Sequence, residues 1–101
     1  MSKIAAVFEI PNLTAAQYDD ILVNLKAQGK LLHEKRCSHV AFSKGENWCV
    51  IDVWDSQEDL MEFGQSTLFA IFEKLGIAPT PPTIYPAHHY IGSVIEEQVE
   101  A

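Results

Sequence analysis

The stretch from Trp48 to Leu60 limits the fold of this chain more than any other part of the sequence. Residues 48–54 are mainly aromatic and β-branched, which is typical of a buried strand. Ser56 follows almost at once with two acids in the next three positions, and this pattern indicates the capped start of a helix. Asp52 lies inside the apolar strand, where a carboxylate needs either a hydrogen-bonding partner or a function.

The rest of the sequence predicts the elements on both sides of this stretch, from apolar spacing and from Pro, Gly and Ser at the joins. We expect strands over 3–10, 31–42, 84–91 and from 47 or 48 to 54, helices over 14–29 and 56–76, a hairpin loop over 43–47 and an extended linker over 77–83. A kink or break is expected near Gly64, because glycine weakens a helix. The order β-α-β-β-α-β predicts an α+β, ferredoxin-like fold, in which two helices cover one face of a four-stranded antiparallel sheet.

Length and charge narrow the class of protein. The 101 residues suffice for one domain, which we place at 1–92, followed by an acidic tail over 93–101. Seven basic and 14 acidic residues give a net charge of −7, which argues against binding to nucleic acid or to an anionic membrane surface. We recognise no signal peptide and no membrane-spanning stretch, and therefore expect a cytoplasmic protein.

The two cysteines are expected to be free thiols. If Phe42 lies opposite Trp48 across the hairpin, Cys37 and Cys49 are displaced by about 13 Å along paired strands, at about 3.3 Å per residue. A disulfide needs α-carbons within about 7 Å of each other.

Both faces of the predicted strands are apolar, although the helices cover only one of them. A bare apolar face of this size needs a partner, and the commonest partner is a second copy of the same chain. The sequence therefore predicts a homodimer that forms through the open face of the sheet.

The residues from Val50 to Ser56, followed by Leu60, Phe63 and the pair Leu68-Phe69, form a strand that ends in tryptophan and a helix with early phenylalanines. This arrangement resembles the dimeric α+β barrel superfamily, which includes the antibiotic-biosynthesis monooxygenase-like proteins. The resemblance implies that two sheets form a barrel, that each subunit has a cleft between sheet and helices, and that Trp54 faces this cleft. The superfamily contains oxygenases, isomerases, decolorising peroxidases and many proteins of unknown role, so the resemblance speaks for the fold more than for an activity.

The sequence departs from the haem-degrading members of that superfamily. Those proteins have a histidine on the second helix, where this chain has Phe72, Glu73 and Lys74. They also use an asparagine in the first strand, which this chain lacks over residues 3–10. We therefore expect no haem and no other cofactor.

Asp52 is the first candidate for chemistry. Alternation places it on one face of its strand with Val50 and Trp54, so it lies beside the expected cleft. Partial burial there would suit it to act as a general base. The alternative is a structural role, in which Asp52 pairs with Ser38 or Arg36 of the neighbouring strand.

His39, His88 and Tyr90 are the other candidates. His39 is either a second proton acceptor or a hydrogen-bonded histidine of the strand. His88 and Tyr90 share a face of the last predicted strand, where either could stabilise an oxyanion, and Tyr90 could equally be an aromatic residue of the dimer interface. Two histidines and the Asp52 carboxylate are the ligand types of a two-His-one-carboxylate metal centre. However, no ligand spacing in the sequence supports a metal site, and we expect none.

Two functions remain open, and the sequence does not decide whether the protein is an enzyme. The first is a homodimeric, cofactor-independent, monooxygenase-like enzyme, with a small hydrophobic or aromatic substrate in a cleft lined by Trp54, Phe8 and Val50. In this hypothesis a base in the cleft removes a proton, and dioxygen or water completes the reaction. The second is a non-catalytic homodimer that binds a ligand or supports another protein. It predicts a closed cleft, plugged by Trp54 and Phe8, in which every polar group is satisfied.

Overall fold

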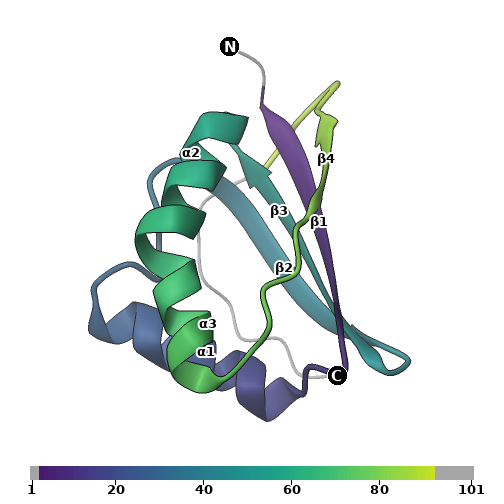
Figure 1. The fold of residues 1–101 in the computed structure, drawn as a ribbon. Helices are drawn as coiled ribbons and strands as arrows, with labels where there is room; N and C mark the ends of the chain where they lie inside the picture. The colour runs from purple at the N-terminus through teal and green to yellow at the C-terminus, as the bar shows by residue number, and fades with distance from the viewer. Residues whose placement is uncertain (1–2, 93–101) are drawn as a thin grey trace.

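The computed structural model describes residues 3–92, and it contains one four-stranded antiparallel sheet with a helical layer on one face (Figure 1). The strands are β1 (Ile4–Pro11), β2 (Arg36–Lys44), β3 (Asn47–Trp54) and β4 (Thr83–Pro86). The helices are α1 (Ala15–Ala27), α2 (Gln57–Phe63), the π-helical segment η1 (Gly64–Leu68) and α3 (Phe69–Leu75). The strand order is β2-β3-β1-β4, so the predicted α+β fold with its βαββαβ order is confirmed. The predicted tail over 93–101 lies outside the described residues.

Both helices of the predicted pattern begin at the residues that the sequence indicates. At α1, the Thr14 hydroxyl accepts a hydrogen bond from the Gln17 backbone N–H (3.1 Å), and the Gln17 side chain accepts one from the Thr14 backbone N–H (2.9 Å). This reciprocal capping box satisfies two N–H groups that the helix itself leaves without acceptors. At α2, the Ser56 hydroxyl accepts from the Asp59 backbone N–H (3.1 Å). These local contacts fix where each helix leaves the sheet.

The second helix is interrupted where Gly64 predicts a kink or a break, and the interruption takes the form of a π-helical turn. The backbone N–H of Phe69 bonds to the carbonyl oxygen of Gly64, five residues earlier. α2, η1 and α3 still form one column beside the sheet (Figure 1). Phe63 before this turn and Ile71 after it are both buried, so the column contributes to the core on either side of the interruption. Turns of this kind recur near functional sites.

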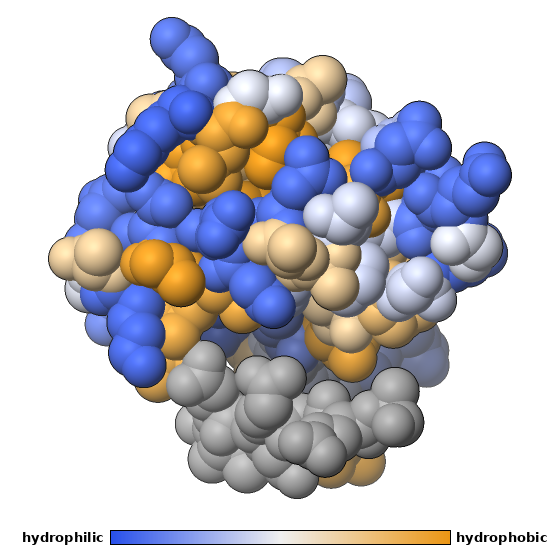
Figure 2. All heavy atoms as spheres, turned by 90° about the horizontal axis from the view of Figure 1, so that it is seen from below, coloured by the Kyte–Doolittle hydropathy of each residue, from blue (hydrophilic) through white to orange (hydrophobic). Residues whose placement is uncertain are grey.

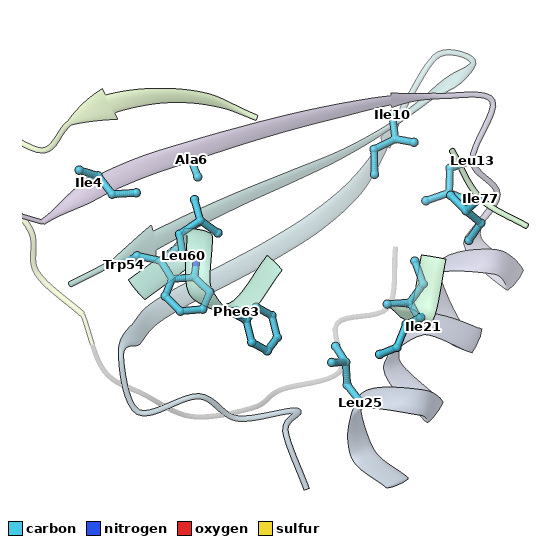
Figure 3. Close-up of a cluster of buried hydrophobic side chains, with 11 residues drawn as sticks. Ile4, Ala6, Ile10, Leu13, Ile21, Leu25, Trp54, Leu60, Phe63 and Ile77 are labelled. Atoms are coloured by element: carbon cyan, nitrogen blue, oxygen red, sulfur yellow. The ribbon is translucent and has the colours of Figure 1, made fainter. Parts of the chain in front are cut away.

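The core lies between the sheet and the helices (Figure 3). The indole of Trp54 is fully buried, and it packs against Phe63 at 5.3 Å between ring centroids. Truncation of a buried tryptophan to alanine typically costs about 3–5 kcal/mol, so this pair is a main contributor to stability. The members of the core are Ile4, Ala6, Ile10, Leu13, Ile21, Leu25, Trp54, Leu60, Phe63, Ile71 and Ile77.

Two predicted strands are shorter in the structure. The strand expected over 31–42 begins only at Arg36, because the polar residues before it form bends and a turn, with the Arg36 N–H bonded to the His33 carbonyl (3.0 Å). The strand expected over 84–91 ends at Pro86, which has no N–H to continue an edge strand. His88 to Tyr90 therefore lie beyond the sheet, and the alternation assumed for them does not apply.

The hairpin between β2 and β3 is tighter than expected. Lys44 pairs with Asn47, so the loop has two residues, and Gly45 takes the left-handed conformation (φ +62°) that such loops favour. Phe42 consequently lies opposite Cys49, one position away from the register expected at the sequence level. Cys37 and Cys49 are both free and buried.

The face of the sheet opposite the helices is apolar and accessible. It carries four large exposed side chains, Val40, Phe42, Ile51 and Tyr85, and each is at least 36% exposed. Val40 lies directly opposite Ile51, and the apolar residue Ala5 lies between Tyr85 and Val53, so an apolar surface extends across the four strands. Among the described residues, no helix has the length and the apolar character to cross a membrane.

Candidate functional site

The candidate site is built on a histidine and a carboxylate that face each other on neighbouring strands. His39 of β2 is paired with Asp52 of β3, on the side of the sheet that the helices cover. The His39 Nδ1 lies 2.5 Å from the Asp52 Oδ1. The Asp52 side chain is only 6% exposed and the His39 side chain 25% exposed. The carboxylate is thus removed from water while the imidazole keeps an accessible edge.

Trp54 supplies the second partner of the carboxylate. Residues two apart in a strand share a face, so the indole of Trp54 lies beside Asp52, and its Nε1 donates to the Asp52 Oδ2 (3.2 Å). A carboxylate only accepts hydrogen bonds, so the proton of the neutral His39 ring belongs on Nδ1. This leaves the Nε2 of His39 as a proton acceptor.

Tyr18 of α1 completes a chain of three side chains. Its hydroxyl lies 2.5 Å from the His39 Nε2, and its ring is nearly parallel to the imidazole (8° between planes). The sequence predicts an apolar stripe on this helix, formed by Tyr18, Ile21, Leu22 and Leu25, and this pattern gives no sign of a contact between Tyr18 and His39. The available signal was that Tyr18 is the one member of that stripe with a polar tip. The resulting chain is Tyr18, His39 and Asp52, with Trp54 behind the carboxylate.

A narrow cavity of about 60 Å³ lies against this chain, between the sheet and the helices. Phe8 and Val50, both predicted to bind substrate, line it together with His39 and Asp52. Most of the remaining lining side chains are aliphatic or aromatic residues of the helical layer. The cavity has room for a few water molecules, so an aromatic ring enters it only if lining side chains move.

A larger hollow of about 320 Å³ lies at the end of β1, beside the start of α1 and the segment after α3. None of its lining residues has a titratable side chain, so it offers no group for acid–base chemistry. Figure 2 shows this end of the molecule, where apolar side chains gather between hydrophilic ones. The smaller cavity beside His39 is therefore the candidate site.

Three predicted site residues do not lie at this cavity. Trp54 does not line it: the indole lies behind Asp52 and packs in the core instead. His88 is exposed beyond β4. The Tyr90 hydroxyl donates to the Cys37 carbonyl oxygen (3.1 Å), so this tyrosine fastens the segment after β4 to β2. The structure does not bring the two predicted oxyanion-stabilising residues to the predicted bases.

A second polar cluster lies near the ends of β1 and β3, outside the cavity. The Lys3 Nζ lies 2.7 Å from the Asp55 Oδ1 and 3.2 Å from the Cys37 Sγ. The ammonium group of Lys3 holds the pKa of Asp55 below its usual value, and Asp55 in turn raises the pKa of Lys3. Burial raises the pKa of the Cys37 thiol. A protonated, buried thiol is a poor nucleophile, so this cluster is structural.

Within residues 3–92, no group of three or more His, Cys, Asp or Glu side chains is arranged to hold a metal ion.

No family model matches this chain, and no curated protein matches it in sequence. Solved structures share its fold, among them the following two. A conserved protein from Methanosarcina mazei Go1 is 16% identical, with a TM-score of 0.55 over 86% of this chain and 92% of the other. A protein from Bordetella bronchiseptica, described as a candidate antibiotic biosynthesis monooxygenase, is 14% identical, with a TM-score of 0.56 over 90% of this chain and all of the other. At such identities the likeness concerns the fold alone, and it confirms the α+β fold with βαββαβ order that is expected from the sequence.

Proposed function

We propose that this protein is an enzyme that removes a proton from a small apolar compound with an acidic hydroxyl or enolisable group. The observation that carries this proposal is the contact of 2.5 Å between the buried Asp52 carboxylate and His39, whose imidazole lines a largely apolar cavity and whose Nε2 is bonded to the Tyr18 hydroxyl. A base that is oriented by a third group is the usual arrangement for proton abstraction. Asp52 holds the ring in place and stabilises the imidazolium that forms when His39 accepts a proton.

Tyr18 indicates what kind of group His39 accepts a proton from. In the resting protein a phenol hydroxyl lies 2.5 Å from the His39 Nε2. A substrate hydroxyl of similar acidity would replace it there, and the Tyr18 side chain would move toward solvent. Movement of this side chain also enlarges a cavity that is otherwise too narrow for an aromatic ring.

The steps after proton removal, in this proposal, are those of a monooxygenase-like reaction. Deprotonation of an enolisable CH₂ compound gives an electron-rich enolate, which reacts with dioxygen. The substrate supplies all four electrons that reduce dioxygen, so that R₂CH₂ and O₂ give R₂C=O and H₂O without an added reductant. The likeness of the fold to the Bordetella bronchiseptica protein supports this reaction class. The proposal also includes what the sequence predicts: the reaction needs no cofactor, and the substrate is a small hydrophobic or aromatic compound.

The same proposal includes a homodimer. The open face of the sheet carries Val40, Phe42, Ile51 and Tyr85, all large and exposed. Exposed apolar side chains that form one continuous surface indicate a protein interface. A second copy of the chain is the partner proposed, because one self-complementary patch on a two-fold axis satisfies both copies.

A second candidate function is ligand binding without catalysis. The observation that favours it is that both oxygens of Asp52 and both ring nitrogens of His39 already have partners, beside a cavity of only about 60 Å³. This pairing of the polar groups supports the non-catalytic hypothesis, although Trp54 does not line the cavity as the predicted plug would. In that case the three side chains hold α1 against the sheet and take no part in proton transfer.

The two candidates are distinguished with 4-nitrophenol, whose anion absorbs visible light. At a pH below the pKa of free 4-nitrophenol, the enzyme hypothesis predicts that the protein increases the visible absorbance of the probe, because His39 takes its proton. His39→Gln and Asp52→Asn should abolish the increase, whereas His89→Gln, a change at an exposed histidine, should preserve it. An absorbance that the protein leaves unchanged, or that His39→Gln leaves intact, would end the proposal in favour of the second candidate.

A further inference from the structure

β2 contains an irregularity that changes which of its residues face the helices. Arg36 is paired with Trp54 and Ser38 with Val53, so Cys37 is an extra residue in this part of the strand. In a regular strand, residues three apart point to opposite faces of the sheet. Because of the bulge, Arg36 and His39 both lie on the face that packs against the helices. Bulges are frequent next to active sites, where they redirect a side chain.

Arg36 lines the same cavity as His39. It is half-buried, and its Nη2 donates to the carbonyl oxygen of Leu31 (2.6 Å). A guanidinium group has five N–H donors, so most of its donors remain available. No acid among residues 3–92 lies within ion-pair distance of Arg36, although the chain has twice as many acids as bases. A half-buried cation without a counter-ion among the described residues, on the wall of a largely apolar cavity, is available to bind an anionic ligand.

The chemistry of the group defines that anion. Arginine binds carboxylates through two parallel N–H···O bonds, and these charge-assisted bonds are stronger in a water-excluded site. Arg36 and His39 lie two register positions apart, opposite Trp54 and Asp52. The backbone positions of the two residues are therefore about 7 Å apart along the strand. The para substituents of a benzene ring are a comparable distance apart.

We propose that Arg36 binds the carboxylate of the substrate, and that the substrate is a small aromatic hydroxy acid whose hydroxyl is placed at His39. The inference rests on the proposed function for the role of His39, and it adds the substrate class and a residue that determines specificity. Once the Tyr18 side chain has moved and widened the cavity, its apolar walls hold the ring between the two polar ends.

The probe is 4-hydroxybenzoate, with phenol and benzoate as the compounds that lack one of its two groups. Affinities are measured by isothermal titration calorimetry on the full chain. The wild-type protein should bind 4-hydroxybenzoate at least about tenfold more tightly than phenol, as expected for a charge-assisted pair. Arg36→Gln should bring this ratio close to one. Lys35→Gln removes the same charge from an exposed neighbour and should leave the ratio unchanged.

Arg36→Lys keeps the charge and removes the planar guanidinium, so it should lower the affinity ratio of 4-hydroxybenzoate to phenol severalfold. This variant replaces Arg36→Gln in the test if Arg36→Gln does not fold. Equal binding of phenol and 4-hydroxybenzoate by the wild-type protein would overturn the inference, as would a ratio that survives Arg36→Gln or the absence of saturable binding by all three compounds.

The outcomes also separate this inference from the proposed function. If benzoate binding depends on Arg36 while 4-nitrophenol is not deprotonated, the arginine site stands and proton abstraction by His39 is wrong. If 4-nitrophenol is deprotonated through His39 while the carboxylate adds no affinity, the proposed function stands and the assignment of Arg36 is wrong.

Discussion

The pairing of His39 with Asp52 predicts a large energetic coupling between two substitutions. His39→Gln leaves the buried Asp52 carboxylate with Trp54 as its only hydrogen-bond donor among the partners observed. Asp52→Asn replaces one acceptor oxygen by an N–H₂ donor. This amide N–H₂ then faces either the N–H of His39 Nδ1 or the N–H of Trp54 Nε1, and two donors cannot bond to each other. Each change therefore leaves a buried polar group without its partner. In the double variant the two amides can bond to each other, so the combined cost should be smaller than the sum.

The expected magnitude follows from burial and charge. Loss of one partner of a fully buried ion pair costs about 3–5 kcal/mol, but the His39 side chain is 25% exposed, and water compensates part of the loss. Hydrogen bonds to charged groups contribute about 1.5–3 kcal/mol, and we expect each single variant to lose about 2 kcal/mol. With a urea slope of about 1.5 kcal/mol per M, the midpoint of unfolding falls by about 1.3 M. The coupling energy should lie at about 1.5–3 kcal/mol.

The assay is urea unfolding of the four proteins, followed by tryptophan fluorescence at one protein concentration, because association would otherwise shift the midpoints. Unchanged slopes would show that the comparison concerns stability alone. If the two single losses add to within about 0.5 kcal/mol, the side chains are not coupled, and the reasoning from their contact is refuted.

Three further predictions follow from the same contacts. Tyr18→Phe removes the hydroxyl that occupies the His39 Nε2, so 4-nitrophenol should bind more tightly, and equal or weaker binding would contradict the role given to Tyr18. Lys3 lowers the pKa of Asp55, so their pair stabilises the fold above the ordinary carboxyl pKa of about 4 and loses this effect as the pH falls through the lowered value. The melting temperature of Asp55→Asn should therefore lie below that of the wild type at pH 7 and meet it in acid; a constant difference would refute the pair. Ile51→Lys places a charge in the open face of the sheet and should convert a dimer to a monomer in sedimentation experiments, whereas a wild type that is already monomeric would contradict the proposed interface.

The fold was predictable because its signals are local. Apolar alternation marks the strands, and Thr14 with Gln17 and Ser56 with Asp59 mark the helix starts within a few residues. The ends of β2 and β4 were less predictable. At Pro86 the limit comes from the hydrogen bonds that an edge strand can make, and these depend on its neighbour as well as on its own sequence.

The candidate site was predictable only in part, because it depends on strand register. Alternation correctly placed Asp52 on the helix-covered face with Val50. With the expected register, Ser38 would lie opposite Asp52; the two-residue loop shifts the pairing by one and puts His39 there. A shift of one residue exchanges every partner, and turn geometry decides it. The bulge at Cys37, which turns Arg36 toward the cavity, has no comparable signal in the sequence.

Proton transfer to His39 is the central claim, and nitrogen-15 NMR of the imidazole ring tests it most directly. In the protein alone, the account predicts a neutral ring with its proton on Nδ1, next to Asp52, and an unprotonated Nε2 next to Tyr18. With saturating 4-nitrophenol, both ring nitrogens should carry a proton while the bound probe is an anion. A His39 ring that stays neutral with the probe bound would contradict the account.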